Sequence, residues 1–260
     1  MQVIAFKTRT QPTERTNMTT SIGLGRSYGR SANEKRPTAI TTHYLEKAPG
    51  SCLIQTGGTK VLCAVTIDEK VKPWRRGSGL GWVTAEYAML PAANGKRTAR
   101  ERANRNGRSM EIERLIGRSL RAAVDMSAIG ETTFNIDCDV IEADGGTRTA
   151  SITGAWVALY EAFEFWKGAG KIRTNPMVSQ VAAISIGQVG GRLLCDLDYQ
   201  EDSHAEVDMN VVMNDKNEII EIQGTGEQAT FDRGKLNGML DLAEAGIKEL
   251  MEEQRRALEI

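Results

Sequence analysis

Hydrophobic and polar residues alternate with a period of two along much of the chain, and glycine or another turn residue closes each alternating run. This pattern is typical of β-strands that bury one face. The Gly190-Gly191 dipeptide between two such runs predicts a tight β-hairpin. The strands predicted in this way cover residues 39–44, 51–56, 59–66, 83–87, 134–141, 181–189, 192–199, 206–212 and 218–223.

Three further segments repeat their apolar residues with the spacing of an α-helix. We expect helices over residues 109–128, with Ser109 as the N-cap, from the turn at Gly146 onward, and over residues 232–258. Strands and helices in this order predict a mixed α+β fold whose sheets are covered by helices. Because strands precede a helix in both halves of the chain, an internal pseudo-repeat is compatible with the pattern.

The N-terminal stretch lacks this periodicity. Residues 1–30 are polar, which predicts a flexible extension, and Met18 offers an alternative start of the chain. Regular patterning begins near Arg36-Pro37, so we expect a single domain over residues 31–260.

The stretch from Cys138 to Ala155 carries the first chemical signal. A strand ends before Asp144-Gly145-Gly146, and a helix opens with Thr147 and Arg148. Free backbone N–H groups and the positive end of a helix dipole attract anions, and an arginine adds a fork of donors. The stretch therefore suggests an anion site. An ordinary connection, with Asp144 or Thr147 capping the helix, is the alternative.

Composition narrows the class of protein. The chain is 40% hydrophobic, and no apolar run approaches the ~18 residues of a membrane-spanning helix. Its first residues lack the features of a secretory signal. None of the four cysteines has metal-site spacing, which favours buried, reduced thiols. We expect a cytoplasmic protein that does not associate with membranes.

The net charge of -1 conceals an uneven distribution of charged residues. Residues 1–36 and 91–108 are basic, whereas residues 196–208 hold six carboxylates and no lysine or arginine. Separate basic and acidic segments suggest a polyanionic partner and a metal ion, respectively. Solvated loops are the simpler alternative for either run.

These features together suggest phosphoryl transfer. Asp208 on a strand and Asp202 before it could hold Mg²⁺, an ion that proteins often bind through only one or two carboxylates. No protein nucleophile stands out, since His43 and His204 are the only imidazoles. If the anion site holds inorganic phosphate, that phosphate can attack a phosphodiester, and the reaction is phosphorolysis.

Four motifs follow one another along the chain: Gly81–Pro91, Gly107–Ile112, Asp137–Ala155 and Asp208–Met213. In this order they resemble the RNase PH family of bacterial ribonuclease PH. The resemblance implies an RNase PH-type fold and a phosphate-dependent 3′→5′ exoribonuclease that trims the 3′ ends of tRNA precursors. It also implies release of nucleoside diphosphates, the reverse nucleotidyltransferase reaction, use of Mg²⁺, and a homo-hexamer built as a trimer of dimers.

The resemblance also assigns roles to individual residues. The family's phosphate-binding positions correspond to Arg108, Gly146, Thr147 and Arg148, and its metal-binding carboxylates to Asp202 and Asp208. Of these, the resemblance implies a catalytic role for Arg108, Arg148, Asp202 and Asp208.

The basic loop departs from the family pattern in two respects. Arg97 and Arg100 correspond to basic residues that hold RNA. Ala92 stands where many members have an arginine, and the loop before Arg108 is shorter. Arg102 and Arg105 could compensate as further RNA-binding residues.

Two other functions remain open at this point. One is a non-catalytic RNA-binding subunit of a ring, although such a scaffold needs none of the four candidate catalytic residues. The other is a metal-dependent hydrolytic nuclease, which would release nucleoside monophosphates.

Overall fold

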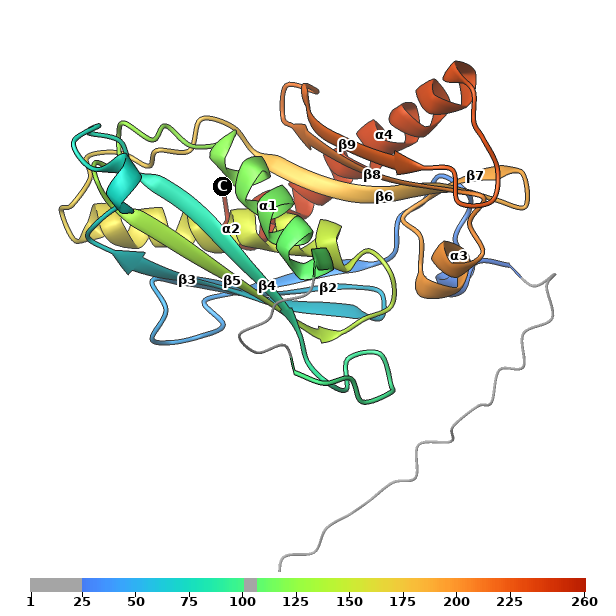
Figure 1. Ribbon diagram of the computed structural model, residues 1–260, viewed down its shortest axis with the longest axis horizontal. Helices are drawn as coiled ribbons and strands as arrows, with labels where there is room; N and C mark the ends of the chain where they lie inside the picture. The colour runs from blue at the N-terminus through green and yellow to red at the C-terminus, as the bar shows by residue number, and fades with distance from the viewer. Residues whose placement is uncertain (1–24, 101–106) are drawn as a thin grey trace, which may run out of the picture.

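The computed structural model describes residues 25–100 and 107–260, and it contains two β-sheets with helices packed between and beside them (Figure 1). The first sheet contains β1 (Thr38–Thr42), β2 (Gly50–Thr56), β3 (Thr59–Asp68), β4 (Trp82–Met89) and β5 (Thr133–Glu142). The second contains β6 (Val181–Val189), β7 (Arg192–Cys195), β8 (Val207–Asn214) and β9 (Ile219–Thr225). The α-helices are α1 (Gly107–Arg121), α2 (Thr147–Gly168), α3 (Tyr199–Ser203) and α4 (Arg233–Leu258), and two short 3₁₀ helices are η1 (Ser27–Gly29) and η2 (Pro73–Arg75).

The first sheet has the strand order β1-β2-β3-β5-β4. Its neighbours are antiparallel except β4 and β5, which run parallel because α1 lies between them in the chain. The second sheet is antiparallel, with the order β7-β6-β8-β9. Gly190 and Gly191 both adopt positive φ in the β6–β7 turn, which confirms the predicted hairpin.

Helix α2 lies between the two sheets and belongs to the core on most of its sides. Small residues permit this close packing. A Cβ atom on Gly154, for example, would lie only 2.7 Å from the side chain of Ile54 on β2. Helix α4 packs on the second sheet through residues such as Met239, Ala243 and Ile247. A mixed α+β architecture of sheets and helices, as predicted, is therefore confirmed.

Several boundaries differ from the predictions. Helix α1 includes Gly107 and ends at Arg121, so Ser109 lies in the first turn and is not the N-cap. The strand predicted over residues 192–199 ends at Cys195, and the short helix α3 follows it. The sequence pattern missed α3 because five residues are too few to show helical periodicity.

The well-packed part of the chain begins earlier than the sequence pattern suggests. Arg26 forms a 2.7 Å ion pair with Glu201, and only 8% of its side chain is exposed. Arg30 is buried among the acidic residues that precede α3. The predicted extension over residues 1–30 is therefore wrong for these two positions, since the arginines neutralise acidic residues distant in sequence. Residues 1–24 lie outside the described part of the chain, and the single domain over residues 31–260 stays a prediction.

Two predictions from composition can be compared with the structure. All four cysteines are free and buried, as expected for reduced thiols. Among the described helices, none has the length and hydropathy needed to cross a membrane.

Candidate active site

The glycine turn, Asp144-Gly145-Gly146, connects β5 to α2 and lies against the chain segment that leads into α3. Gly145 and Gly146 have φ values of +75° and +63°, which L-residues with side chains rarely adopt. A Cβ atom on Gly145 would lie 2.6 Å from the carbonyl oxygen of Leu197. Only glycine at this position allows the turn to approach the α3 segment so closely.

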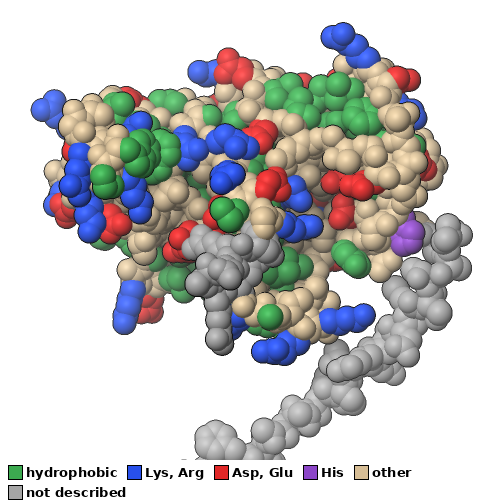
Figure 2. Space-filling model, viewed as in Figure 1, with side chains coloured by type: hydrophobic (Ala, Val, Ile, Leu, Met, Phe, Trp, Pro, Cys, Tyr) green, Lys and Arg blue, Asp and Glu red, His purple; other side chains and the backbone are tan. Residues whose placement is uncertain are grey.

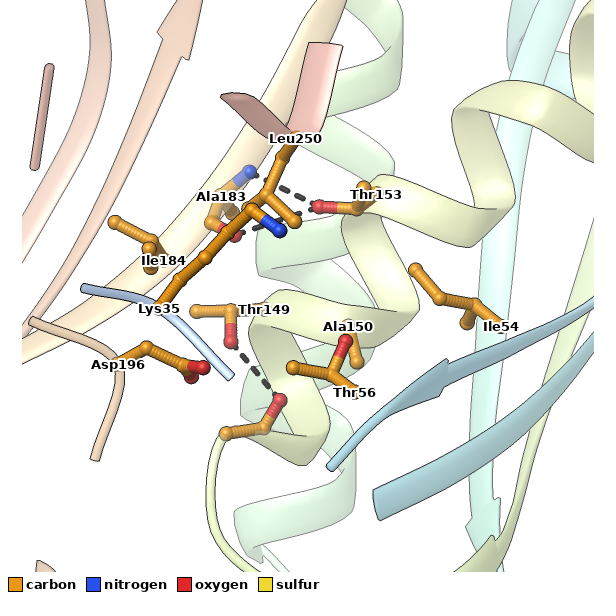
Figure 3. Close-up of a pocket in the computed structure, with 11 residues that line it drawn as sticks. Lys35, Ile54, Thr56, Thr149, Ala150, Thr153, Ala183, Ile184, Asp196 and Leu250 are labelled. Carbon is orange, nitrogen blue, oxygen red and sulfur yellow. Dashed lines mark hydrogen bonds between the residues drawn. The ribbon is translucent and has the colours of Figure 1, made fainter. Parts of the chain in front are cut away.

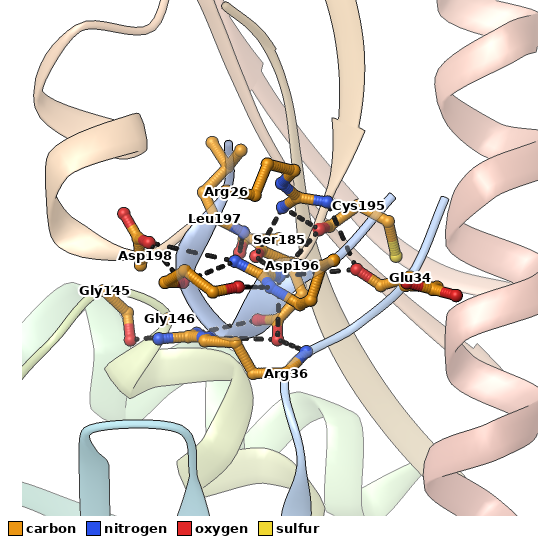
Figure 4. Close-up of polar contacts among 12 residues, drawn as sticks. Arg26, Glu34, Arg36, Gly145, Gly146, Ser185, Cys195, Asp196, Leu197 and Asp198 are labelled. Carbon is orange, nitrogen blue, oxygen red and sulfur yellow. Dashed lines mark hydrogen bonds and ion pairs between the residues drawn. The ribbon is translucent and has the colours of Figure 1, made fainter. Parts of the chain in front are cut away.

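Arg36 holds the glycine turn in place (Figure 4). Its guanidinium group donates to the backbone carbonyls of Asp144 and Gly145 and binds the carboxylate of Asp196 through two hydrogen bonds. Thr59 adds a 2.6 Å hydrogen bond from its hydroxyl group to the Gly145 carbonyl. The turn is therefore held by side chains from two other parts of the chain.

The same cluster of charges positions α3. Asp198 caps this helix by accepting a hydrogen bond from the Glu201 backbone, and Glu201 bonds back to the Asp198 amide. Glu201 is in turn paired with Arg26 and Arg30. Because the next residue in the helix is Asp202, these interactions determine where its carboxylate lies.

The N-terminus of α2 is left without a side-chain cap in the described structure. Gly146 is the N-cap and has no side chain to offer. Asp144 instead accepts a hydrogen bond from the Tyr199 amide, and the Thr147 hydroxyl is 2.8 Å from that of Tyr87. The alternative that Asp144 or Thr147 caps the helix is therefore wrong, and the first-turn amides are able to bind an anion.

Arg148 lies in this first turn and is oriented by two residues from other elements. Its Nη1 atom is 3.2 Å from Oε1 of Gln223 on β9 and 3.9 Å from a carboxylate oxygen of Glu111 on α1. Gln223 also donates a 2.7 Å hydrogen bond to Glu111. Sequence analysis gave no role to Gln223, whose local pattern is that of an ordinary strand residue, and it included Glu111 only as part of the Gly107–Ile112 motif, without a role at the site.

Arg108, near the start of α1, acts electrostatically on the same groups as Arg148. Burial raises the pKa of Tyr87, and the positive charges of both arginines oppose this rise. Desolvation likewise raises the pKa of Asp202, although its side chain remains open to solvent, and Arg148 and Arg108 again oppose the change. The structure thus brings two candidate phosphate ligands and one candidate metal ligand together.

Asp208, at the start of β8, completes the group. Burial and repulsion from the Asp202 carboxylate raise the pKa of Asp208 to about 6. Two nearby carboxylates that repel each other fit a divalent cation with oxygen ligands, because the cation relieves the repulsion. No cluster of three or more potential metal ligands occurs in residues 25–100 and 107–260, so Mg²⁺ here would take its other ligands from water or phosphate.

A small cavity lies next to the glycine turn and the first turns of α2, and residues including Gly146, Thr149 and Asp196 line it (Figure 3). Its volume is about 10 Å³, which is room for roughly one water molecule. A phosphate ion does not fit there. This cavity is therefore not the anion site suggested by the sequence.

Comparison with known proteins identifies the fold. Residues 34–163 match the first domain of the 3′ exoribonuclease family, RNase PH, and residues 179–246 match its second domain. The chain belongs to this family. The glycine turn and Arg148 lie within the first matched region, and Asp202 and Asp208 lie within the second, so the candidate site is formed where the two family domains meet.

Solved structures of exosome proteins have the same RNase PH fold. The chain is similar to a protein of the Archaeoglobus fulgidus exosome with RNA bound to the active site, with 22% identity over 88% of this chain and 92% of that chain and a TM-score of 0.76. For rice (Oryza sativa) Rrp46 the identity is 19%, the coverage 90% and 100%, and the TM-score 0.73. An archaeal exosome core chain shows 22% identity, coverage of 87% and 90%, and a TM-score of 0.71.

The expected RNA-binding residues of this RNase PH domain are placed differently from the phosphate-site residues. Arg97 and Arg100 are exposed, and the charge of Arg100 opposes the rise in the pKa of Asp139 that burial causes. Among the described contacts, none links these two arginines to Arg148 or Asp208. Arg102 and Arg105 lie outside the described residues. Figure 2 shows basic and acidic side chains interleaved in the central region between the two sheets.

Proposed function

We propose that the protein is a phosphate-dependent 3′→5′ exoribonuclease of the bacterial ribonuclease PH type. The uncapped N-terminus of α2, with Arg148 in its first turn and Arg108 close enough to act on the same groups, supports this proposal most directly. Two arginines and free amides suit the charge and shape of inorganic phosphate. Membership of the 3′ exoribonuclease family supports RNA as the other substrate.

Phosphate serves as the nucleophile in the proposed reaction. Arg108, Arg148 and the amides of the Gly146-Thr147 segment orient it in line with the last phosphodiester of the RNA. One phosphate oxygen forms a bond to the terminal phosphorus, the bond from that phosphorus to the preceding 3′ oxygen breaks, and the proton lost by the phosphate balances the one gained by the 3′ oxygen. The products are a nucleoside diphosphate and an RNA shorter by one nucleotide.

Asp202 and Asp208 would hold Mg²⁺ beside the bound phosphate. When bound, the ion would stabilise negative charge at the leaving oxygen. Arg97, Arg100, Arg102 and Arg105 bind phosphate groups of the RNA 3′ end in this proposal, so affinity depends on salt more than on base sequence. We further propose tRNA precursors as substrates, a homo-hexamer formed from three dimers, and a cytoplasmic location.

Product analysis tests the proposal. Purified protein is incubated with Mg²⁺ and a 3′-labelled RNA, with and without inorganic phosphate, and the products are separated by thin-layer chromatography. We expect nucleoside diphosphates only when phosphate is present, and elongation of RNA when nucleoside diphosphates are supplied instead. Monophosphates formed without phosphate would indicate hydrolysis, and no product in either buffer would indicate a non-catalytic subunit. Either result refutes the proposed reaction.

A further inference from the structure

An exposed aromatic and basic patch lies on the opposite end of α1 from Arg108. Its centre is Trp74 in η2, a residue that is 63% exposed and whose ring meets that of Trp82 edge to face with 4.9 Å between centroids. We call Lys72, Trp74, Arg75, Arg76 and Arg121 the aromatic–basic patch. Hydrophobic side chains flanked by lysine and arginine are visible over this part of the molecule, at the left of Figure 2.

The backbone beneath the patch is fixed by specific contacts. Val71 is buried, and the Thr133 hydroxyl donates a 2.7 Å hydrogen bond to the carbonyl of Lys70. Arg75 Nε donates to the carbonyl of Gly81 at 3.2 Å. The exposed indole is therefore presented by a segment that needs little further ordering to bind a partner.

The patch also has an excess of positive charge. The guanidinium carbons of Arg75 and Arg121 lie 5.0 and 4.4 Å from the ring centroid of Trp82, so two cations share one aromatic ring. Burial and the charges of Arg118 and Arg75 lower the pKa of Arg121. Within the described residues, no carboxylate forms an ion pair with any basic member of the patch, whereas neighbouring Arg118 is paired with Glu221. A flexible polyanion that also carries flat rings matches this surface.

Helix α1 connects the patch with the candidate active site. Arg108 and Arg121 are 13 residues apart in this helix, which corresponds to about 20 Å along its axis. Arg114, Arg118 and Arg121 recur at spacings of four and three residues and share one side of the helix. An extended RNA strand whose 3′ end occupies the active site can run along this side of the helix to Trp74, past Arg114 and Arg121, whereas Arg118 is held by Glu221.

We propose that the aromatic–basic patch binds a single-stranded segment of the RNA substrate upstream of its 3′ end, with one base stacked on Trp74 and phosphates on Lys72 and Arg76. This inference rests on the proposed function, because it takes RNA as the substrate. If the patch binds RNA in this way, the protein binds long RNAs more tightly than oligonucleotides that are too short to reach from the active site to the patch.

Equilibrium binding without phosphate and Mg²⁺ tests the stacking contact independently of catalysis. Trp74→Ala should weaken binding of a long single-stranded RNA about tenfold, the range expected for loss of one stacked base, and leave a short oligonucleotide unaffected. Trp74→Phe should keep most of the affinity, since phenylalanine also stacks. Phe165→Ala is the matched control, because Phe165 is a comparably exposed aromatic residue at the far end of α2.

The electrostatic contact needs a separate variant. Lys72→Ser combined with Arg76→Ser should reduce the slope of log affinity against log salt by about 1.4 for the long RNA, because two phosphate contacts are lost. Neither side chain is buried, so the fold should not be affected.

Three results would overturn this inference. The first is an unchanged affinity of Trp74→Ala for the long RNA, and the second is an equal loss of affinity for the long and the short RNA. The third is a change in the oligomeric state of Trp74→Ala, measured by light scattering, which would make the patch an interface between copies of the chain. If Trp74→Ala weakens binding as expected but the wild-type protein releases no nucleoside diphosphates, the proposed reaction fails while the RNA-binding patch is retained.

Discussion

Arg36 and Asp196 form a two-point ion pair in the protein interior. Arg36 Nε lies 3.0 Å from Oδ2 of Asp196, and Nη2 lies 2.7 Å from Oδ1. The same guanidinium group donates to the carbonyls of Asp144 and Gly145. The pair therefore joins the segment before β1, the glycine turn and the segment before α3, three parts of the chain that meet at the candidate active site.

Replacing Arg36 with alanine should destabilise the protein strongly. The change removes both side-chain hydrogen bonds to the buried Asp196 carboxylate and leaves only Arg30, 4.0 Å away, as a counter-charge, and breaking a buried pair in this way typically costs about 3–5 kcal/mol. Arg36→Lys keeps the positive charge but loses the forked geometry, so its free energy of unfolding should lie between those of the wild type and Arg36→Ala. Chemical denaturation measures these values. A loss below about 1 kcal/mol for Arg36→Ala would contradict the structural role given to the pair.

Arg108→Ala should impair phosphorolysis much more than RNA binding. Loss of one preorganised charge-stabilising group typically lowers kcat by about 10²- to 10³-fold. Rates of diphosphate release at varied phosphate concentration, together with RNA affinity measured without phosphate, separate the two effects. Arg173→Ala is the control, since Arg173 is an exposed arginine outside the site. Equal losses of rate and RNA affinity in Arg108→Ala would argue against Arg108 as a phosphate ligand.

The central part of the candidate site could be predicted because its signals are local. The glycine pair, the helical periodicity after it, and the alternation that places Asp208 on a strand all lie within short windows of sequence. The prediction of an anion-accepting helix N-terminus depended only on residues 144–148, and the structure leaves that N-terminus uncapped.

The supporting contacts could not be predicted because they join residues far apart in the sequence. Arg26 binds Glu201 across 175 positions, and Gln223 binds Glu111 across 112. In one sequence without its fold, a basic segment such as residues 25–36 has the same composition as a solvated tail. Only the three-dimensional arrangement shows that its arginines neutralise the acidic residues before α3.

Gly145→Ala should disturb the glycine turn. Its φ of +75° strains any residue with a Cβ atom, and that atom would lie 2.6 Å from the Leu197 carbonyl oxygen. We expect a loss of about 1–3 kcal/mol in stability together with reduced phosphorolysis. Gly168→Ala is the matched control, because a Cβ atom there meets nothing within 4 Å at the end of α2. Calorimetry should show a lower Tm than the wild type for Gly145→Ala but not for Gly168→Ala. Equal Tm values for the two variants would contradict this account.

Asp208→Asn should weaken the response to Mg²⁺. The substitution removes one of two carboxylates that repel each other and so reduces the charge available to a divalent cation. The Mg²⁺ concentration for half-maximal rate should rise about tenfold or more, and Mn²⁺ binding followed by electron paramagnetic resonance gives a readout that does not depend on turnover. Asp215→Asn, in the turn after β8, changes the same charge at an exposed position and should behave as the wild type. Identical Mn²⁺ affinities for both variants would exclude Asp208 as a ligand.

Glu161 on α2 makes the stability of the protein depend on pH. Burial raises the pKa of Glu161, although the Ser51 amide and the charge of His43 favour its ionised form. A carboxyl group whose folded-state pKa exceeds its unfolded value binds protons more readily in the folded state, so stability falls as pH rises from about 4.5 through the folded-state pKa. Glu161→Gln stays neutral, and its Tm should therefore rise relative to the wild type as pH increases across this window.

Glu164→Gln on the same helix is a control with the opposite sign. The Lys167 ammonium group, which donates to the Glu164 carboxylate, lowers the pKa of Glu164, so the wild type gains stability as pH rises through that range. The Tm of Glu164→Gln should fall relative to the wild type as pH increases, by a small amount because this pair is partly exposed. Thermal melts of the three proteins at a series of pH values measure both trends. If the Tm difference between Glu161→Gln and the wild type changes with pH in the same direction as that of Glu164→Gln, burial does not govern the titration of Glu161.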